Sequence, residues 1–222
     1  MIESSQTTEL NAELSTELTA ENKARAVVYN FLSSLFAKEV NKDLVEQLSS
    51  EQGQSFLSSL ALEPALAPCI KEINTKLAQL DSEESLLELA ADFCGLFLVD
   101  GKTSVSPYAG QYLSKKQDKN KSQLFGELHQ LMTEFLTNSK MQIHSDFPEP
   151  ADHIAVILAY IAHLCVSTND ELQLKFIKIY LMSWISDFAQ QVKKHDHGHF
   201  YCAVAGLTLH WLQTDVNYLA SD

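Results

Sequence analysis

Glycine and proline are scarce in this sequence, with 7 and 5 residues among 222. Antiparallel sandwiches and barrels need many tight turns, and such turns are built largely from these two residue types. Alternation of apolar and polar residues, the pattern of a half-buried strand, is also missing over any useful length. These absences argue against a turn-rich β fold and favour a chain built from helices.

Long apolar runs and paired cysteines are missing as well. No run reaches the roughly 18 apolar residues that span a bilayer. The amino-terminal segment, MIESSQTTELNAELSTEL, has neither the basic start nor the apolar block of a secretory signal. The cysteines are far apart, lie among apolar residues and form no C-x-x-C motif: Cys69, Cys94, Cys165 and Cys202. They are expected to be reduced thiols of a cytoplasmic protein.

Basic residues are outnumbered, with 16 Lys and Arg against 29 Asp and Glu and a net charge of −13. A surface of this sign repels phosphate backbones and anionic lipid, so we expect neither nucleic-acid binding nor membrane insertion. It would attract a basic peptide, but charge alone identifies no partner.

Helical periodicity begins near Ala20, and residues 1–19 before it are polar and expected to be disordered. One helical face carries Val27, Val28, Phe31, Leu32, Leu35 and Phe36. Further helices are expected at 42–50, 53–61, 65–80, 81–98, 118–138, 151–166, 169–194 and 198–214. Residues 99–115 are expected to be irregular.

The predicted fold class is all-α, a helical bundle of about nine or ten helices in two unequal groups joined by a hinge. The amino-terminal helical subdomain is expected to span 1–142, the hinge 143–152 and the carboxy-terminal subdomain 153–222. The residues expected in the structural core are Phe93, Leu96, Phe97, Trp184, Phe188 and Trp211.

The stretch DGKTS at 100–104 is superficially similar to a P-loop. The Walker pattern would need glycine at position 96, where this chain has Leu96, and the segment follows a helix rather than a strand. We therefore reject a P-loop. A nucleotide-dependent enzyme remains an alternative without a motif of its own.

The stretch KHDHGHF contains His195, His197 and His199. On a helix His195 and His199 would share a face while His197 points away, and Gly198 is expected to interrupt the helix. Zinc requires three or four converging ligands. No metal site is predicted, although a metal-dependent enzyme using this cluster or His153 stays as an alternative.

The stretch FPEPADHIAVILAYI, residues 147–161, places Glu149, Asp152 and His153 just before an apolar helix. A general base needs a substrate or a nucleophile within reach, and no G-x-S-x-G motif supplies one. Asp152 is well placed as the N-cap of a helix beginning at His153, with Pro150 before it. Capping is therefore favoured over catalysis.

Three segments together resemble the TorD family of cytoplasmic chaperones for molybdoenzymes. They are ADFCGLFLVDG followed by SPYAGQY, then EPADHIAVILAYIAHL, and then the run from YLMSWISDF to LTLHWL. The likeness covers residues 83–213, whereas the first eighty residues match only in helical character. Ala109 after Pro107 and Tyr108 departs from the acidic residue common in the family.

The resemblance implies a chaperone and not an enzyme, with no metal and no required cofactor; weak GTP binding is associated with the family. It would bind the twin-arginine signal peptide and the cofactor-free form of a molybdenum reductase, trimethylamine N-oxide reductase. Its role would be to keep the enzyme competent for molybdopterin insertion before export. The client-binding residues expected are Glu149, Asp152, His153, Asp146, Pro107 and Tyr108, with Asp146 a weaker arginine partner than the other carboxylates.

Two further expectations concern assembly and alternatives. The breaker-rich linker at 139–150 permits helix groups to pair within one chain or to exchange between chains, so monomer and homodimer are both expected. A helical adaptor with unrelated partners is the remaining alternative function.

Overall fold

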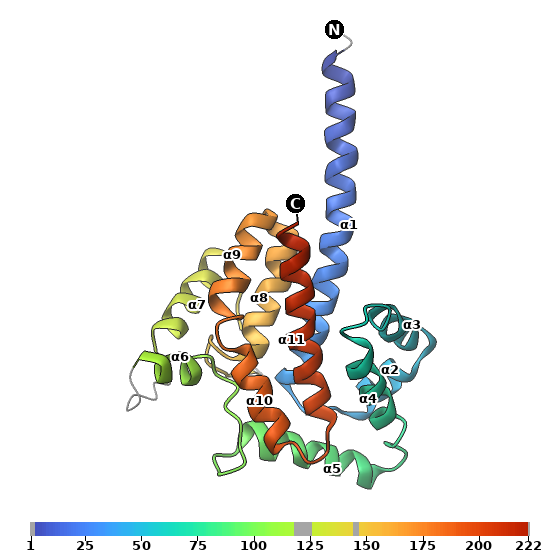
Figure 1. Cartoon of the computed structure of the whole chain (residues 1–222), viewed down its shortest axis with the longest axis vertical. Helices are drawn as coiled ribbons and strands as arrows, with labels where there is room; N and C mark the ends of the chain where they lie inside the picture. The colour runs from blue at the N-terminus through green and yellow to red at the C-terminus, as the bar shows by residue number, and fades with distance from the viewer. Residues whose placement is uncertain (1–2, 118–125, 144–146, 222) are drawn as a thin grey trace.

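The computed structural model describes residues 3–117, 126–143 and 147–221 (Figure 1). Within these ranges the chain forms eleven α-helices, one π-helical turn and no strand, which confirms the all-α fold class. The helices are α1 (Glu3–Ala37), α2 (Lys42–Ser49), α3 (Glu51–Leu60), α4 (Ala67–Leu77), α5 (Glu83–Phe93), η1 (Cys94–Leu98, π-helical), α6 (Gly110–Gln117), α7 (Glu127–Asn138), α8 (Ile154–Ser167), α9 (Asp170–Tyr180), α10 (Ile185–His195) and α11 (Phe200–Leu219). None of these helices is both long and apolar enough to cross a membrane.

Helix α1 packs lengthwise against α8, and its amino-terminal part extends beyond the body of the molecule (Figure 1). Tyr29 and Leu32 of α1 are fully buried, as are Ile157 and Ile161 of α8. The Ser33 hydroxyl also donates to the carbonyl oxygen at the start of α8, at 2.7 Å. The predicted helical face of residues 27–36 thus forms one wall of the core, although Val27 itself is 54% exposed.

Residues 3–19 are helical, where the sequence led us to expect disorder. No glycine or proline occurs anywhere in α1, and Glu, Leu and Ala are frequent in its first half. Once the packed part of α1 has nucleated, each added residue extends the helix at little cost, because nucleation is the expensive step. The expectation of disorder did not consider that the packed part of α1 can extend as one helix toward the amino terminus.

Aromatic rings fill the centre of the molecule. Phe97 of η1 contacts Phe36, Phe93, Phe188 and Tyr201, with ring centroids 5.4 to 6.2 Å apart. Such edge-to-face and offset pairs stabilise a core beyond the area they bury. This cluster joins α1, α5, η1, α10 and α11.

The residues expected to form the core lie in or against it. Phe93, Leu96, Phe97, Trp184 and Phe188 are buried. Trp211 is half-buried and packs edge-on against Tyr29, with centroids 6.1 Å apart.

A single helix over 169–194 was expected, but the chain has two, α9 and α10, with a break at residues 181–184. The Trp184 indole N–H donates to the Tyr180 carbonyl oxygen at 2.8 Å. In a continuous helix that oxygen would accept from the Trp184 backbone N–H, which here donates to Leu181 at 3.2 Å instead. Burial of the Trp184 ring, 1% exposed, accompanies this break.

The segment 99–115, expected to be irregular, ends in helix α6 from Gly110 onward. Near the other chain end, α11 starts after His199, whose φ of 65° is left-handed and stops any continuation from α10. Residues 118–125, part of an expected helix over 118–138, lie outside the described residues.

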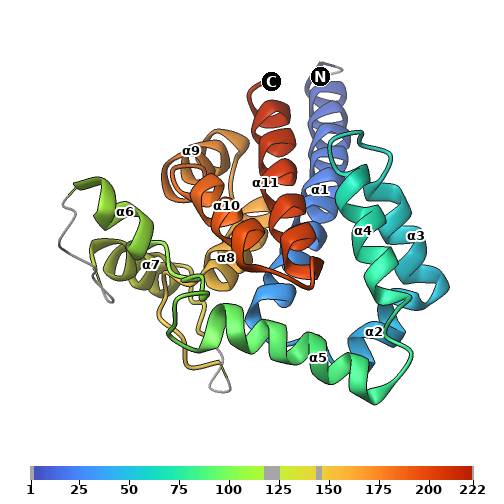
Figure 2. The ribbon, with the colours of Figure 1, turned by 60° about the horizontal axis from the view of Figure 1, so that its bottom comes forward.

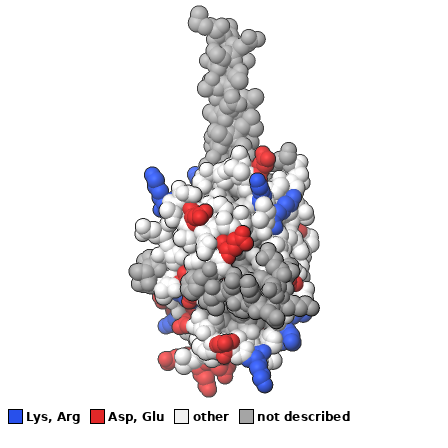
Figure 3. All heavy atoms as spheres, turned by 90° about the vertical axis from the view of Figure 1, so that its left-hand side faces the viewer, with Lys and Arg blue, Asp and Glu red and all other residues white. Residues whose placement is uncertain are grey.

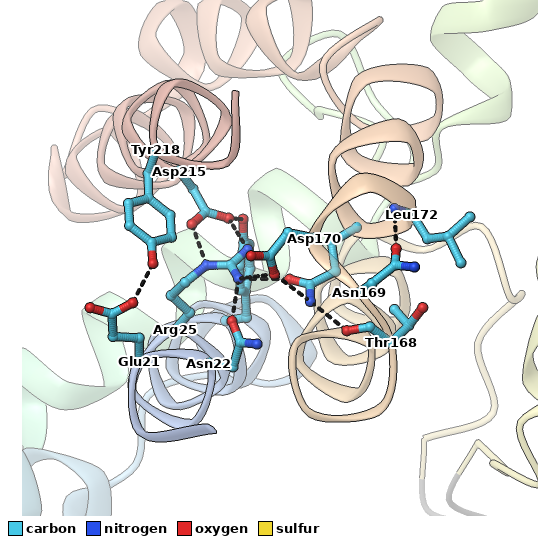
Figure 4. A network of polar contacts seen from close by, with 11 residues as sticks. Glu21, Asn22, Arg25, Thr168, Asn169, Asp170, Leu172, Asp215 and Tyr218 are labelled. Atoms are coloured by element: carbon cyan, nitrogen blue, oxygen red, sulfur yellow. Dashed lines mark hydrogen bonds and ion pairs between the residues drawn. The ribbon is translucent and has the colours of Figure 1, made fainter. Parts of the chain in front are cut away.

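A buried polar network ties α1 to α9 and α11 (Figure 4). Arg25 is 6% exposed and Asp215 is 2% exposed. The Arg25 Nε and Nη2 atoms donate to the two Asp215 carboxylate oxygens at 2.5 and 2.9 Å, and Nη1 donates to Gln173 Oε1 at 2.6 Å. Tyr29 donates to Asp215 Oδ2 at 2.6 Å. Burial lowers the pKa of Arg25, but the hydrogen bond and charge of Asp215 outweigh it and raise that pKa.

Helices from both sides of the predicted hinge share one continuous core, most visibly where α1 meets α8. Helix α5 crosses between α2–α4 on one side and α6–α7 on the other (Figure 2). The division into subdomains 1–142 and 153–222 remains a prediction.

Candidate functional site

Two segments far apart in sequence meet at the amino-terminal end of α8. The Ile154 N–H donates to the Pro107 carbonyl oxygen at 2.9 Å, and the Ala109 N–H donates to the Asp152 carbonyl oxygen at 3.1 Å. These bonds form an antiparallel bridge between Tyr108 and His153. The SPYAG loop and the EPADH segment, both selected from the sequence, therefore form one unit.

Asp152 caps a helix, but not the helix that the sequence predicted. Its Oδ2 accepts from the Gly110 N–H at 3.1 Å, and Gly110 is the first residue of α6. A carboxylate there satisfies an amide that has no partner within the helix and lies at the positive end of the helix dipole. The predicted role as N-cap of α8 is wrong, because the Asp152 carboxylate instead accepts from Gly110, which lies 42 positions earlier in the chain.

The Asp152 carboxylate is almost fully enclosed, with 1% of the residue exposed. Its Oδ1 accepts no hydrogen bond from the described part of the chain. Burial raises the pKa of Asp152, and the Gly110 N–H partly opposes this rise. In this conformation Asp152 cannot touch a partner protein.

His153 is the N-cap of α8. Its Nδ1 accepts from the Ala155 N–H at 3.1 Å, so the ring proton must reside on Nε2. The side chain is 4% exposed and lies edge-on to Tyr108 and Phe147, with ring centroids 5.3 and 5.1 Å away. Burial lowers its pKa to about 4, and the imidazole is therefore neutral at physiological pH.

His129 of α7 contacts the same unit. Its Nδ1 accepts from the Ala151 N–H at 3.0 Å and lies 3.8 Å from Asp152 Oδ1. A protonated imidazole would carry a hydrogen on Nδ1 and could not accept that bond. His129 therefore connects α7 to the EPADH segment through the Ala151 amide.

Glu149 and Tyr108 form the accessible part of the unit. The Tyr108 hydroxyl donates to Glu149 Oε2 at 2.5 Å, and both residues are half-buried. Burial and the Glu149 carboxylate raise the pKa of Tyr108, which keeps the hydroxyl protonated as the donor. Glu149 Oε1 has no hydrogen bond within the described ranges, and it can accept from another group.

An apolar cavity of about 240 Å³, the hinge groove, opens near the amino-terminal end of α8. Its walls come from α1, α7 and α8 and from residues 141–143 and 147, and they include Ala37, Leu136, Met141, Ile143, Phe147 and Ala159. None of the described residues that line it is charged. Phe147 lines the groove and also contacts the His153 ring. The groove therefore adjoins the unit formed by the SPYAG loop and the EPADH segment.

The other sequence candidates lie elsewhere or outside the description. Asp146 lies outside the described residues. Pro107 is buried and contributes its carbonyl oxygen. In the 100–104 stretch, the Ser104 hydroxyl bonds to both the N–H and the carbonyl oxygen of Gly101, which closes a tight turn.

The histidine stretch forms the turn between α10 and α11. Buried Asp196 accepts from the Gly198 N–H at 3.1 Å and from the Cys202 N–H at 2.6 Å. A Cβ atom on Gly198 would lie 2.1 Å from Asp92 Oδ2, so any larger residue would require the Asp92 side chain to move. Among the residues that the structure describes, no three His, Cys, Asp or Glu side chains are arranged to hold a metal ion.

Two parts of the site had no signal in the sequence. His129 lies in α7, 22 positions before Ala151, and nothing in the pattern of α7 marks it. The hinge groove combines four separate segments. Both arise from tertiary packing alone.

On the face shown in Figure 3, acidic and basic side chains of the described residues are interspersed. The charge of −13 is therefore not gathered into one broad patch on that face.

Comparison with known proteins gives consistent matches over nearly the whole chain. The family described as nitrate reductase delta subunit matches residues 61–190. The chaperone protein TorD of Colwellia psychrerythraea is 65% identical over 96% of this chain and 99% of its own length. Those of Shewanella loihica and Aliivibrio salmonicida are 49% and 38% identical, each over 93% of this chain and 98% and 99% of their own lengths. The chain belongs to the TorD family of chaperone proteins.

Proposed function

We propose that this chain is a cytoplasmic chaperone that binds the twin-arginine signal peptide of a cofactor-free molybdenum reductase. The client proposed is trimethylamine N-oxide reductase, held competent for molybdopterin insertion until export. Family membership supports the chaperone role. The observation that carries the site is the contact of Phe147, which lines the apolar hinge groove, with His153 of the same unit as Glu149.

The chemistry of such a peptide matches this arrangement. A twin-arginine signal places guanidinium groups beside an apolar, helix-forming segment. Glu149 Oε1 can accept from a guanidinium while Oε2 keeps its bond to Tyr108, because a carboxylate has several acceptor positions. The apolar segment would bury side chains against Met141, Ile143 and Phe147 of the hinge groove.

The residues proposed as client contacts divide into two kinds. Glu149 and Tyr108 are accessible and are proposed to meet the peptide. Asp152 and His153 are 1% and 4% exposed, so we assign them the task of holding the SPYAG loop against α8. Through that loop they position Tyr108 and hence the Glu149 carboxylate.

Calorimetry with a synthetic twin-arginine peptide tests the proposal. Loss of one charge-assisted bond is worth about 1.5–3 kcal/mol, so Glu149→Gln is expected to weaken binding roughly tenfold or more. Glu134→Gln on exposed α7 surface removes the same charge away from the groove and serves as the control. Equal affinity for wild type and Glu149→Gln would reject Glu149 as the arginine partner.

A further inference from the structure

A second cavity of about 570 Å³ opens between α4, α10 and α11. Its lining is mainly apolar and includes Cys69, Ala189, Cys202 and Leu209. Neither these residues nor these helices contribute to the hinge groove. We call it the carboxy-terminal groove.

The floor of this groove is shaped by small residues. A Cβ atom on Gly206 would lie 3.1 Å from Cys69 Sγ, tighter than ordinary contact, so glycine allows α4 to approach α11 closely. Cys69 and Cys202 are half-buried in the walls and both are free thiols. The groove is thus an open surface with apolar walls rather than a sealed void.

Charge separates the two grooves. The hinge groove adjoins the unit that contains Glu149, and none of its described lining residues is a cation. The carboxy-terminal groove is lined by Lys193, exposed in the last turn of α10, with Glu72 of α4 as its one acid. Lys193 makes no ion pair with any residue of the described ranges.

A basic signal peptide is suited to the first groove and repelled by Lys193 at the second, since like charges in close apposition cost affinity. An ammonium group at the rim of an apolar groove instead complements an apolar segment that carries a carboxylate. In a chain with a net charge of −13, this groove accepts such a segment with less repulsion than acidic surface would.

We propose that the carboxy-terminal groove binds an apolar segment bearing an acidic residue in the body of the cofactor-free reductase, outside its signal peptide. The inference rests on the proposed function. The chaperone would then hold its client at two sites, with the signal peptide in the hinge groove and the folded body against the carboxy-terminal groove.

Lys193 and Lys194 provide a matched pair for the test. They are neighbours on α10 and both are exposed, but only Lys193 lines the groove. The reductase is prepared without cofactor and with its signal peptide deleted, and its binding to wild-type chaperone, Lys193→Glu and Lys194→Glu is measured by calorimetry. Lys193→Glu is expected to weaken binding roughly tenfold, and Lys194→Glu less than about twofold. Equal loss in both variants, or loss in neither, overturns the groove.

The native cysteines give a second readout that needs no variant. Alkylation of each cysteine by N-ethylmaleimide is followed by peptide mass spectrometry with and without the cofactor-free mature reductase. Labelling of Cys202 and Cys69 is expected to slow several-fold when the reductase is bound, while Cys94, in η1 outside the groove, keeps its rate. Unchanged labelling of Cys202 in the saturated complex overturns the proposal.

Two outcomes separate this proposal from the one on which it rests. If the synthetic signal peptide binds but the mature reductase does not, the carboxy-terminal groove is rejected and the signal-peptide site stands. If the mature reductase binds in a Lys193-dependent way but the peptide does not, the proposed function fails at the hinge groove alone. A chaperone dimer that Lys193→Glu dissociates would assign the groove to a second copy of this chain and overturn the inference.

Discussion

The Tyr108 hydroxyl donates to the Glu149 carboxylate at 2.5 Å, across 41 positions of sequence. This bond fixes one oxygen of the carboxylate and leaves the other directed away from Tyr108. Because a fixed acceptor loses less conformational entropy when it binds, Tyr108 prepares Glu149 for a cationic ligand.

Tyr108→Phe tests this preparation. The ring remains and can still contact His153, but the hydrogen bond is lost. We expect peptide affinity to fall about three- to tenfold, in line with one hydrogen bond of roughly 1 kcal/mol, with the thermal midpoint little changed. Tyr218→Phe removes a comparable bond to Glu21 and is the control. Unaltered affinity in calorimetry would show that Glu149 needs no such support.

The apolar wall of the hinge groove gives a second prediction. Ile143→Ser removes apolar surface from the groove and is expected to weaken the signal peptide by about 1 kcal/mol or more. Val166→Ser, at a position of α8 that is 55% exposed and outside the groove, makes a similar chemical change as a control. Calorimetric affinities that fall equally in both variants would contradict a specific apolar site.

His153 predicts a dependence of stability on pH. Its pKa is about 4 in the folded chain against an ordinary value of 6.5, so between these values the unfolded chain takes up a proton that the folded chain refuses. Stability contributed by this group is complete above pH 6.5 and is lost as the pH falls toward 4. The full loss is about 3 kcal/mol, at 1.36 kcal/mol per pKa unit. Asp152, with its raised pKa, acts in the opposite direction at the acid end of this range.

Urea unfolding at pH 7 and pH 5 measures the effect. His153→Asn keeps a side chain that caps helices well and removes the titrating group. The variant should lose less stability than wild type between the two pH values. The same loss in both proteins would place the pH dependence elsewhere.

The buried pair of Arg25 and Asp215 predicts strong non-additivity. Asp215→Leu leaves the guanidinium buried without its partner and is expected to cost about 3–5 kcal/mol of unfolding free energy. Arg25→Met combined with Asp215→Leu removes both charges and should recover most of that loss. Urea unfolding of the two singles and the double measures the coupling, and simple addition of the single losses would argue against an interacting pair.

The proposed coexistence of monomer and dimer is tested by mass measurement over a wide concentration range. Exchange of helix groups through the 139–150 linker predicts slow interconversion, because the shared core of α1 and α8 must open first. A single monomeric mass at every concentration would remove the dimer.

The helices themselves could be predicted from apolar periodicity, because the stripe that a helix buries is recorded in consecutive residues. The start of α6 could not, since the cap on Gly110 comes from Asp152. The break at Trp184 depends on the position of one indole N–H. At the candidate site, the sequence singled out the EPADH segment but could not tell that Asp152 and His153 are buried while Glu149 stays accessible.

The contact between Arg25 and Asp215 joins residues 190 positions apart, one in the first helix of the fold and one in the last. A ribosome must therefore complete almost the whole polypeptide before α1 can be fastened to α11. Folding through such distant contacts is slow compared with local helix formation. The nascent chaperone is thus expected to reach its native fold only after release from the ribosome. A client would then not encounter an incompletely folded chaperone.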